Sequence, residues 1–224
     1  MKEGDSVQFK CLVLDHDETV VQSELAVGYP FFCRHLSSIR PGMTITPEDY
    51  ITDCYTIGFV DMCVNKLQFT AEELAEEHRL WLEHVRTNIP DPFPGMKDII
   101  LKQKKLGGLL CVVSHSGIEN ISRDYMTHFG ILPDDIYGWD LPKEQRKPNP
   151  YPLQSIMEKY DLTPADILVV DDSKLSWEMA APLGVKTAFA GWGKKDFPVL
   201  AKEMESLCDY SFYSTKELEK FLFD

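Results

Sequence analysis

The fold of this 224-residue chain is decided by one stretch near its start, Phe9-Lys10-Cys11-Leu12-Val13-Leu14-Asp15-His16-Asp17-Glu18-Thr19. A short apolar run ends there in two carboxylates that are one residue apart. The run predicts a buried strand, and the carboxyl ends of strands are where α/β enzymes bind their ligands. Extended geometry continued through Asp17 would point the side chains of Asp15 and Asp17 to the same side. We therefore expect a cationic group between them.

The composition indicates a globular protein and narrows its partners. Hydrophobic residues make up 44% of the chain, the formal charge is -13 and the pI is about 4.9. Nucleic acids and anionic membranes need a basic face, so we expect neither as the main partner. No apolar run reaches the roughly 18 residues of a membrane helix, and no signal-peptide cleavage pattern follows the first run. We expect a cytoplasmic protein whose six cysteines are reduced packing residues.

Four apolar runs have the length and composition of strands, and helical stretches separate the later ones: Phe9–Leu14, Leu109–Val113, Ile167–Val170 and Val185–Ala190. This order predicts an α/β fold with a parallel sheet. The first two runs are about ninety residues apart, far more than one crossover helix needs. We therefore assign residues 1–21 and 92–224 to an α/β core and residues 22–91 to an inserted unit.

The inserted unit is expected to be helical. Thr70 and Glu73 have the spacing of a capping box, and the helix that they begin is predicted to run to about Arg86. Its apolar residues recur at helical period and form one face, consisting of Ala71, Leu74, Trp81 and Val85. The insert also carries eleven acidic and five basic residues from position 22 to 92, so a highly anionic substrate body is not favoured.

Two further sites follow core strands. Ser114 ends the second run, and Ser116 is placed to cap a helix that runs to about Phe129, where free N–H groups favour an anion. Lys147 stands before a helix that we expect to be capped by Asn149 and to begin at Pro150; a lysine held there could act as a point charge on a phosphate. Taken singly, Ser114 could be only a turn residue and Lys147 only a solvated surface residue.

The third run delivers a second pair of carboxylates, Asp171 and Asp172. Together with Asp15 and Asp17 they would repel, since each pair at about 4 Å costs roughly 4 kcal/mol at an effective dielectric near 20. A hard divalent cation such as Mg²⁺ would relieve that repulsion and would also neutralise phosphate. The alternative is that one of the two caps the helix that follows.

Taken together, these residues resemble the haloacid dehalogenase-like (HAD) superfamily, in its phosphoglycolate phosphatase and β-phosphoglucomutase-like branch. The first motif of that family is Asp-x-Asp-x-Thr, then come a strand-end Ser or Thr, a lysine and an acidic pair. The matching residues occur in that order as Asp15-His16-Asp17-Glu18-Thr19, Ser114, Lys147 and Asp171-Asp172. The resemblance implies a Rossmann-like core with a helical cap of the C1 type, and a phosphatase that acts on a small phosphorylated metabolite.

The resemblance also implies roles for these residues. Asp15 would be the nucleophile that forms an aspartyl-phosphate, and Asp17 would be the general acid/base. Mg²⁺ would be held by the Asp15 carboxylate, the Asp17 carbonyl, Asp172 and, directly or through water, Asp171. Ser114, the His115 amide and Lys147 would hold the phosphoryl oxygens, with Thr19 in a supporting role.

Several positions discriminate within the superfamily. Dehalogenases lack a carboxylate at the position of Asp17, and Lys66 has no setting typical of the Schiff-base lysine of a phosphonatase. Departures from the common pattern are Glu18 where glycine is frequent, Gln22 where aspartate is frequent, and Ser176 where some members have an acidic residue. His16 is expected to be a packing or surface residue, and the side chain of His115 is a candidate for contact with substrate.

Three alternatives remain beside a phosphatase. A receiver module of a signalling system would place its acidic pair early in the chain, whereas Asp171-Asp172 follows Lys147. A non-catalytic HAD-like scaffold would have no need of Asp15 and Asp17. A phosphosugar mutase of the β-phosphoglucomutase kind shares all four motifs, and the lifetime of phospho-Asp15 against water would separate it from a phosphatase. The oligomeric state, and which cations of the insert face the substrate, are left open.

Overall fold

The computed structural model describes residues 7–224, and they form two compact units. The larger unit combines the residues up to Val21 with Asp91–Asp224, and the smaller unit is Gln22–Pro90. The elements follow in the order β1 (Cys11–Leu14), α1 (Tyr29–Ile39), α2 (Pro47–Thr56), α3 (Phe59–Asp61), α4 (Ala71–Thr87), α5 (Met96–Lys105), β2 (Leu109–Val113), α6 (Ile118–Phe129), β3 (Asp135–Tyr137), α7 (Tyr151–Tyr160), β4 (Ile167–Asp171), α8 (Lys174–Ala180), β5 (Lys186–Ala190), α9 (Pro198–Leu207), β6 (Tyr210–Phe212) and α10 (Thr215–Phe223).

The larger unit is built on a parallel sheet of six strands within residues 7–224, in the order β3-β2-β1-β4-β5-β6. The chain passes from β1 to β2 and β3 on one side and then returns to β4 on the other side of β1. That reversal is a topological switch point, where parallel sheets open a crevice at the carboxyl ends of their strands. The predicted α/β, Rossmann-like fold is confirmed.

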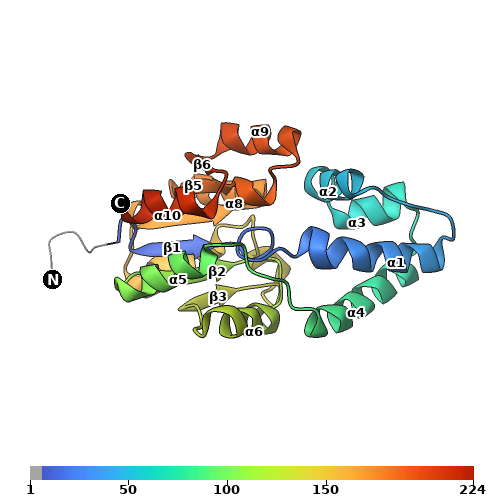
Figure 1. The fold of residues 1–224 in the computed structure, drawn as a ribbon, viewed down its shortest axis with the longest axis horizontal. Helices are drawn as coiled ribbons and strands as arrows, with labels where there is room; N and C mark the ends of the chain where they lie inside the picture. The colour runs from blue at the N-terminus through green and yellow to red at the C-terminus, as the bar shows by residue number, and fades with distance from the viewer. Residues whose placement is uncertain (1–6) are drawn as a thin grey trace. The chain divides into compact units, whose positions relative to one another are not determined.

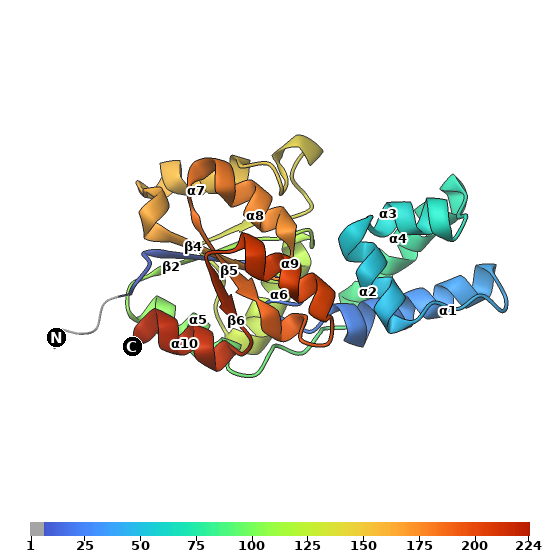
Figure 2. The same ribbon diagram turned by 90° about the horizontal axis from the view of Figure 1, so that it is seen from above.

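Alternating side chains of the central strands supply two separate apolar layers. On one face Leu12 and Leu14 pack with buried residues of α5, α6 and α10. On the other face Cys11 and Val13 pack with buried residues of α7 and α8. Figure 2 shows α5 and α10 on one side of the sheet and α7 and α8 on the other. Because both faces are covered, β1 and β4 are buried along their whole length, as their continuous apolar sequences predict.

The smaller unit is helical, as Figure 1 shows for α1 to α4. Its core forms around Phe32 of α1, which is 1% exposed. The Phe32 ring lies 5.3 Å from the Tyr50 ring of α2, 5.5 Å from the Phe59 ring of α3 and 6.2 Å from the Phe69 ring, measured between centroids. This aromatic cluster joins the first three helices of the unit. No helix of residues 7–224 is long and apolar enough to cross a membrane.

Helix α4 begins at the predicted capping box. Thr70 Oγ1 accepts a hydrogen bond from the Glu73 amide at 3.2 Å, and the Glu73 carboxylate accepts one from the Thr70 amide at 2.9 Å. The predicted apolar face of α4 also contains Glu77, which lies three residues after Leu74 and four before Trp81. Glu77 is only 4% exposed, and burial raises its pKa to about 7.

The raised pKa of Glu77 predicts a pH-dependent loss of stability. Because the folded chain binds this proton more tightly than the unfolded chain, stability should fall as the pH rises from the ordinary glutamate pKa of 4.5 through 7. At 1.36 kcal/mol per pKa unit the loss is at most about 3 kcal/mol. The thermal midpoint of Glu77→Gln minus that of wild type should therefore increase from pH 5 to pH 8.

The exposed Glu83 on the same helix provides the control, since Glu83→Gln should shift the midpoint equally at both pH values. An effect of Glu77→Gln that is the same at pH 5 and at pH 8 would contradict this account.

Candidate active site

The register of the sheet brings the first and fourth motifs together. Leu14 of β1 pairs with Val170 of β4, and the Asp15 amide donates to the Val170 carbonyl at 2.9 Å. Asp15 and Asp171 are therefore the next residues on adjacent strands. The strand does not continue to Asp17: β1 ends at Leu14, and a tight loop follows in which the Val21 amide donates to the His16 carbonyl at 3.0 Å. Strand alternation through Asp17, which the sequence led us to expect, is wrong.

Lys147 joins the two aspartates. Its ammonium nitrogen lies 2.6 Å from Asp15 Oδ1 and 2.8 Å from Asp171 Oδ2. All three side chains are at least nine-tenths buried, with 5% or less of each exposed. A single fixed cation thus bridges carboxylates from two neighbouring strands. The cation expected between Asp15 and Asp17 lies instead between Asp15 and Asp171, and Asp17 is bound by the Ser116 hydroxyl.

The shared lysine does not neutralise the two carboxylates equally. Burial, followed by the charge of Asp171, raises the pKa of Asp15 well above its usual value, and Lys147 only partly opposes this. Burial would also raise the pKa of Asp171, but the Lys147 ammonium, the Ser176 hydroxyl and the Ser173 amide together hold it below the usual value. Burial disfavours the charged form of Lys147, yet the two aspartates outweigh it and raise its pKa. Lys147 therefore offsets the negative charge around Asp15 only in part.

The acidic pair at the end of β4 is held by the start of α8. The helix is capped by Ser173, and neither aspartate is its cap residue. Asp171 instead accepts a hydrogen bond from the Ser173 amide at 2.7 Å and another from the Ser176 hydroxyl. Asp172 makes an ion pair with Lys194, whose nitrogen lies 2.8 Å from Asp172 Oδ2. Sequence analysis did not single out Lys194, because it belongs to none of the four motifs.

Ser114 and Ser116 follow β2, but the role expected of Ser116 is wrong. Helix α6 is preceded by Gly117, and the Ile118 amide donates to Asp140 Oδ2 at 2.7 Å. The Ser116 hydroxyl instead donates to Asp17 Oδ2 at 2.6 Å. Ser116 is itself fixed, because its amide donates to Ser114 Oγ at 3.1 Å. The structure thus connects the first and second motifs through Ser116 and Asp17.

The loop that carries Lys147 is anchored beside the second motif. The His115 Nε2 lies 2.8 Å from the Lys147 carbonyl, and the His115 ring packs edge-on to Trp139 with centroids 5.9 Å apart. Burial and the nearby Lys147 charge lower the pKa of His115.

Helix α7 begins at Tyr151 rather than at Pro150, and the Asn149 side chain accepts a hydrogen bond from the Tyr151 amide at 2.9 Å. The expected start was therefore one residue too early.

The remaining residues of the first motif are buried. His16 Nε2 lies 3.0 Å from Asp124 Oδ2, and each side chain is 2% exposed, so His16 is a packing residue tied to α6. Thr19 Oγ1 is buried without a hydrogen-bond partner. Glu18 is 6% exposed and has a φ of 54°, a conformation that favours glycine. That backbone requirement accounts for the glycine expected at this position.

Comparison with known proteins identifies the family. A sequence model described as haloacid dehalogenase-like hydrolase matches residues 12–190. The chain belongs to this family. A search of curated proteins finds no match.

Solved structures of HAD proteins share the fold over nearly the whole chain. A predicted phosphoglycolate phosphatase from Haemophilus somnus 129PT has 20% identity and a TM-score of 0.75, covering 96% of this chain and 98% of that one. A mutant of CbbY from Rhodobacter sphaeroides in complex with xylulose-(1,5)bisphosphate has 18% identity and a TM-score of 0.71, covering 94% and 96%. A conserved HAD-like protein of unknown function from Agrobacterium tumefaciens has 17% identity and a TM-score of 0.77, covering 95% and 97%.

The acidic cluster fits the divalent cation that the HAD resemblance implies. Asp15, Asp171 and Asp172 each offer one carboxylate oxygen, and these oxygens lie within 4.8 Å of one another. All three residues are buried, and Lys147 and Lys194 supply fewer positive charges than the three carboxylates supply negative ones. Oxygen donors at this spacing suit a hard divalent cation such as Mg²⁺, which takes carboxylate and water oxygens as ligands.

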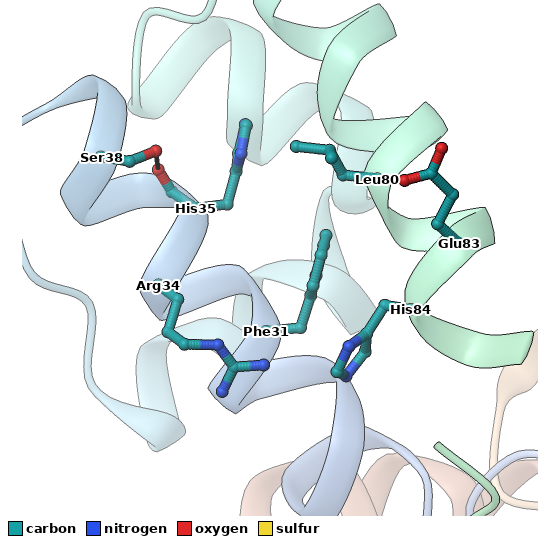
Figure 3. Close-up of a pocket in the computed structure, with 7 residues that line it drawn as sticks. All are labelled: Phe31, Arg34, His35, Ser38, Leu80, Glu83 and His84. Atoms are coloured by element: carbon teal, nitrogen blue, oxygen red, sulfur yellow. Dashed lines mark hydrogen bonds between the residues drawn. The ribbon is translucent and has the colours of Figure 1, made fainter. Parts of the chain in front are cut away.

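The smaller unit has a cavity of its own between α1 and α4, with a volume of about 490 Å³. Figure 3 shows the Phe31 ring at its centre, with the rings of His35 and His84 nearby. The Phe31 ring stacks on His84 at 4.9 Å and on His35 at 6.3 Å between centroids. Arg34 also lines the cavity. Burial lowers the pKa of His35 and of His84, so both rings favour the neutral form.

Proposed function

We propose that this HAD-family protein is a Mg²⁺-dependent phosphatase that hydrolyses a small phosphomonoester through an aspartyl-phosphate on Asp15. The observation that carries the proposal is the buried Lys147 bridge between Asp15 and Asp171 beside a third carboxylate, Asp172. A buried cation fixed on the carboxylate that would attack phosphorus is the arrangement that phosphoryl transfer needs, because negative charge must be held there.

Each residue of the cluster has a part in the proposed reaction. Asp15 attacks phosphorus and Lys147 neutralises the phosphoryl oxygens, with Ser114 and the His115 amide as further donors. Asp15, Asp171 and Asp172 would hold Mg²⁺, together with the Asp17 carbonyl. When bound, Mg²⁺ supplies positive charge that offsets the repulsion between the carboxylates and the phosphate.

Asp17 is proposed to protonate the leaving oxygen and then to take a proton from water. Its hydrogen bond from Ser116 at 2.6 Å would fix the orientation of the carboxylate for both steps. Ser116 is thus a positioning residue in this proposal. Thr19, whose carbonyl accepts a hydrogen bond from the Trp192 indole, is proposed to support the loop that carries Asp17.

We further propose that Gln22–Pro90 is the C1 cap of this enzyme and that it selects the substrate. Three of its five cations are paired with carboxylates, at Arg40 with Glu73, Lys66 with Asp53, and Arg79 with Glu76 and Glu83. Few cations of the unit are therefore available to an anionic substrate body, which supports a small phosphomonoester. A cytoplasmic location stays a prediction from the sequence.

A screen of small phosphomonoesters tests the proposed reaction. Wild type should release phosphate from at least one ester when Mg²⁺ is present and should lose this activity in a metal chelator. Asp15→Asn keeps the shape of the side chain but removes the nucleophile, so its rate should fall by about 10³-fold or more. The exposed Asp196 provides the control, and Asp196→Asn should keep the wild-type rate.

Undiminished hydrolysis by Asp15→Asn would refute the mechanism. Inactivity of wild type on every ester would favour a non-catalytic scaffold. A phospho-Asp15 that persists in water and passes its phosphoryl group to a sugar phosphate would favour a mutase.

The hydrogen bond from Ser116 to Asp17 predicts a dependence on the leaving group. A general acid matters most when the leaving oxygen is strongly basic. Ser116→Ala should therefore lower kcat about tenfold or more on an alkyl phosphate and much less on p-nitrophenyl phosphate. Ser116→Thr retains the hydroxyl and should restore most of the loss. An equal loss on both esters would show that Ser116 acts elsewhere.

A further inference from the structure

Lys194 is a second buried lysine beside the acidic cluster. Its side chain is 3% exposed, and that of its partner Asp172 is 8% exposed. Lysine is rarely buried to this degree unless it is paired, because removing its charge from water is costly. The pairing places a fixed positive charge directly on one of the three carboxylates that fit a divalent cation.

The loop that carries Lys194 is built against the first motif. It follows β5, and the Trp192 indole donates to the Thr19 carbonyl at 3.0 Å. Gly193 lies so close to Glu18 that an added Cβ would be 2.2 Å from the Glu18 carbonyl oxygen. Only glycine fits that approach. The loop is therefore held at the cluster by two contacts that are independent of the ion pair itself.

Lys194 and a bound Mg²⁺ would compete for the same carboxylate. The ammonium lies 2.8 Å from Asp172 Oδ2, and two cations on one carboxylate in a buried site repel strongly because few waters screen them. Lys147 does not compete for Asp172 in the same way, since its contacts are with Asp15 and Asp171.

We infer that Lys194 is a positioning residue that neutralises Asp172 when Mg²⁺ is absent and thereby weakens Mg²⁺ binding. The inference rests on the proposed function in that it takes Asp172 as a metal ligand. It has two consequences. The metal-free cluster keeps its folded arrangement, and occupancy of the site depends on the free Mg²⁺ concentration rather than being permanent.

Calorimetric titration of the full-length protein with MgCl₂ tests this role without an activity readout. In Lys194→Met the dissociation constant for Mg²⁺ should fall at least tenfold, because the competing charge is gone. The thermal midpoint of the metal-free variant should fall below that of wild type, and saturating Mg²⁺ should raise it more than it raises the wild-type midpoint.

Three variants make the comparison specific. Lys195 is the exposed neighbour of Lys194, and Lys195→Met should bind Mg²⁺ like wild type. Lys194→Arg keeps the charge and should stay within about twofold of the wild-type constant. If Lys194→Met does not fold, Lys194→Gln, which can still donate to Asp172, should show the same tightening.

The outcomes separate the two proposals. Unchanged or weaker Mg²⁺ binding in Lys194→Met or Lys194→Gln, with normal binding in wild type, would overturn the role of Lys194 alone. Absence of Mg²⁺ binding in wild type and in every variant would overturn the metal-dependent function and this inference with it.

Discussion

The ammonium group of Lys147 holds together two carboxylates that the sheet places side by side and whose charges would otherwise repel. β1 and β4 are adjacent and in register, so Asp15 and Asp171 must emerge side by side at their ends. The cost of burying these charges is offset only if a cation is fixed between them, and removing one partner from such a cluster typically destabilises a protein by about 3–5 kcal/mol. The register of the sheet thus places the two carboxylates together, and their burial in turn requires the Lys147 charge between them.

The four carboxylates of the site are bound by different partners. Lys147 is bound to both Asp15 and Asp171, whereas Lys194 is bound to Asp172. Asp17 is held by a neutral donor, the Ser116 hydroxyl. A carboxylate that must give and take protons is better oriented by a hydroxyl than by a fixed charge, because an ammonium would favour its ionised form. The contacts therefore match the different tasks proposed for the four carboxylates.

The sequence predicted the fold because each central strand is an apolar run that ends in a polar motif, and parallel strands bring such ends to one edge. The short strands Asp135–Tyr137 and Tyr210–Phe212 were missed, since three residues carry no clear periodicity. Lys194 was missed for another reason. It lies 22 residues after Asp172 in the sequence, and the packing of Trp192 and Gly193 on the first motif places it beside the acidic cluster. Ser116 was misassigned because a serine before a helix is usually its cap.

Localising the phosphoryl group on the chain tests the central claim most directly. The wild-type protein is mixed with Mg²⁺ and an ester that it hydrolyses, quenched in acid within one turnover, and digested. The digest should contain one peptide that is heavier by a single phosphoryl group. We predict that this group is on Asp15, that hydroxylamine removes it as expected of an acyl phosphate, and that Asp15→Asn yields none. A phosphoryl group on another residue, or the same labelling in Asp15→Asn, would contradict the account.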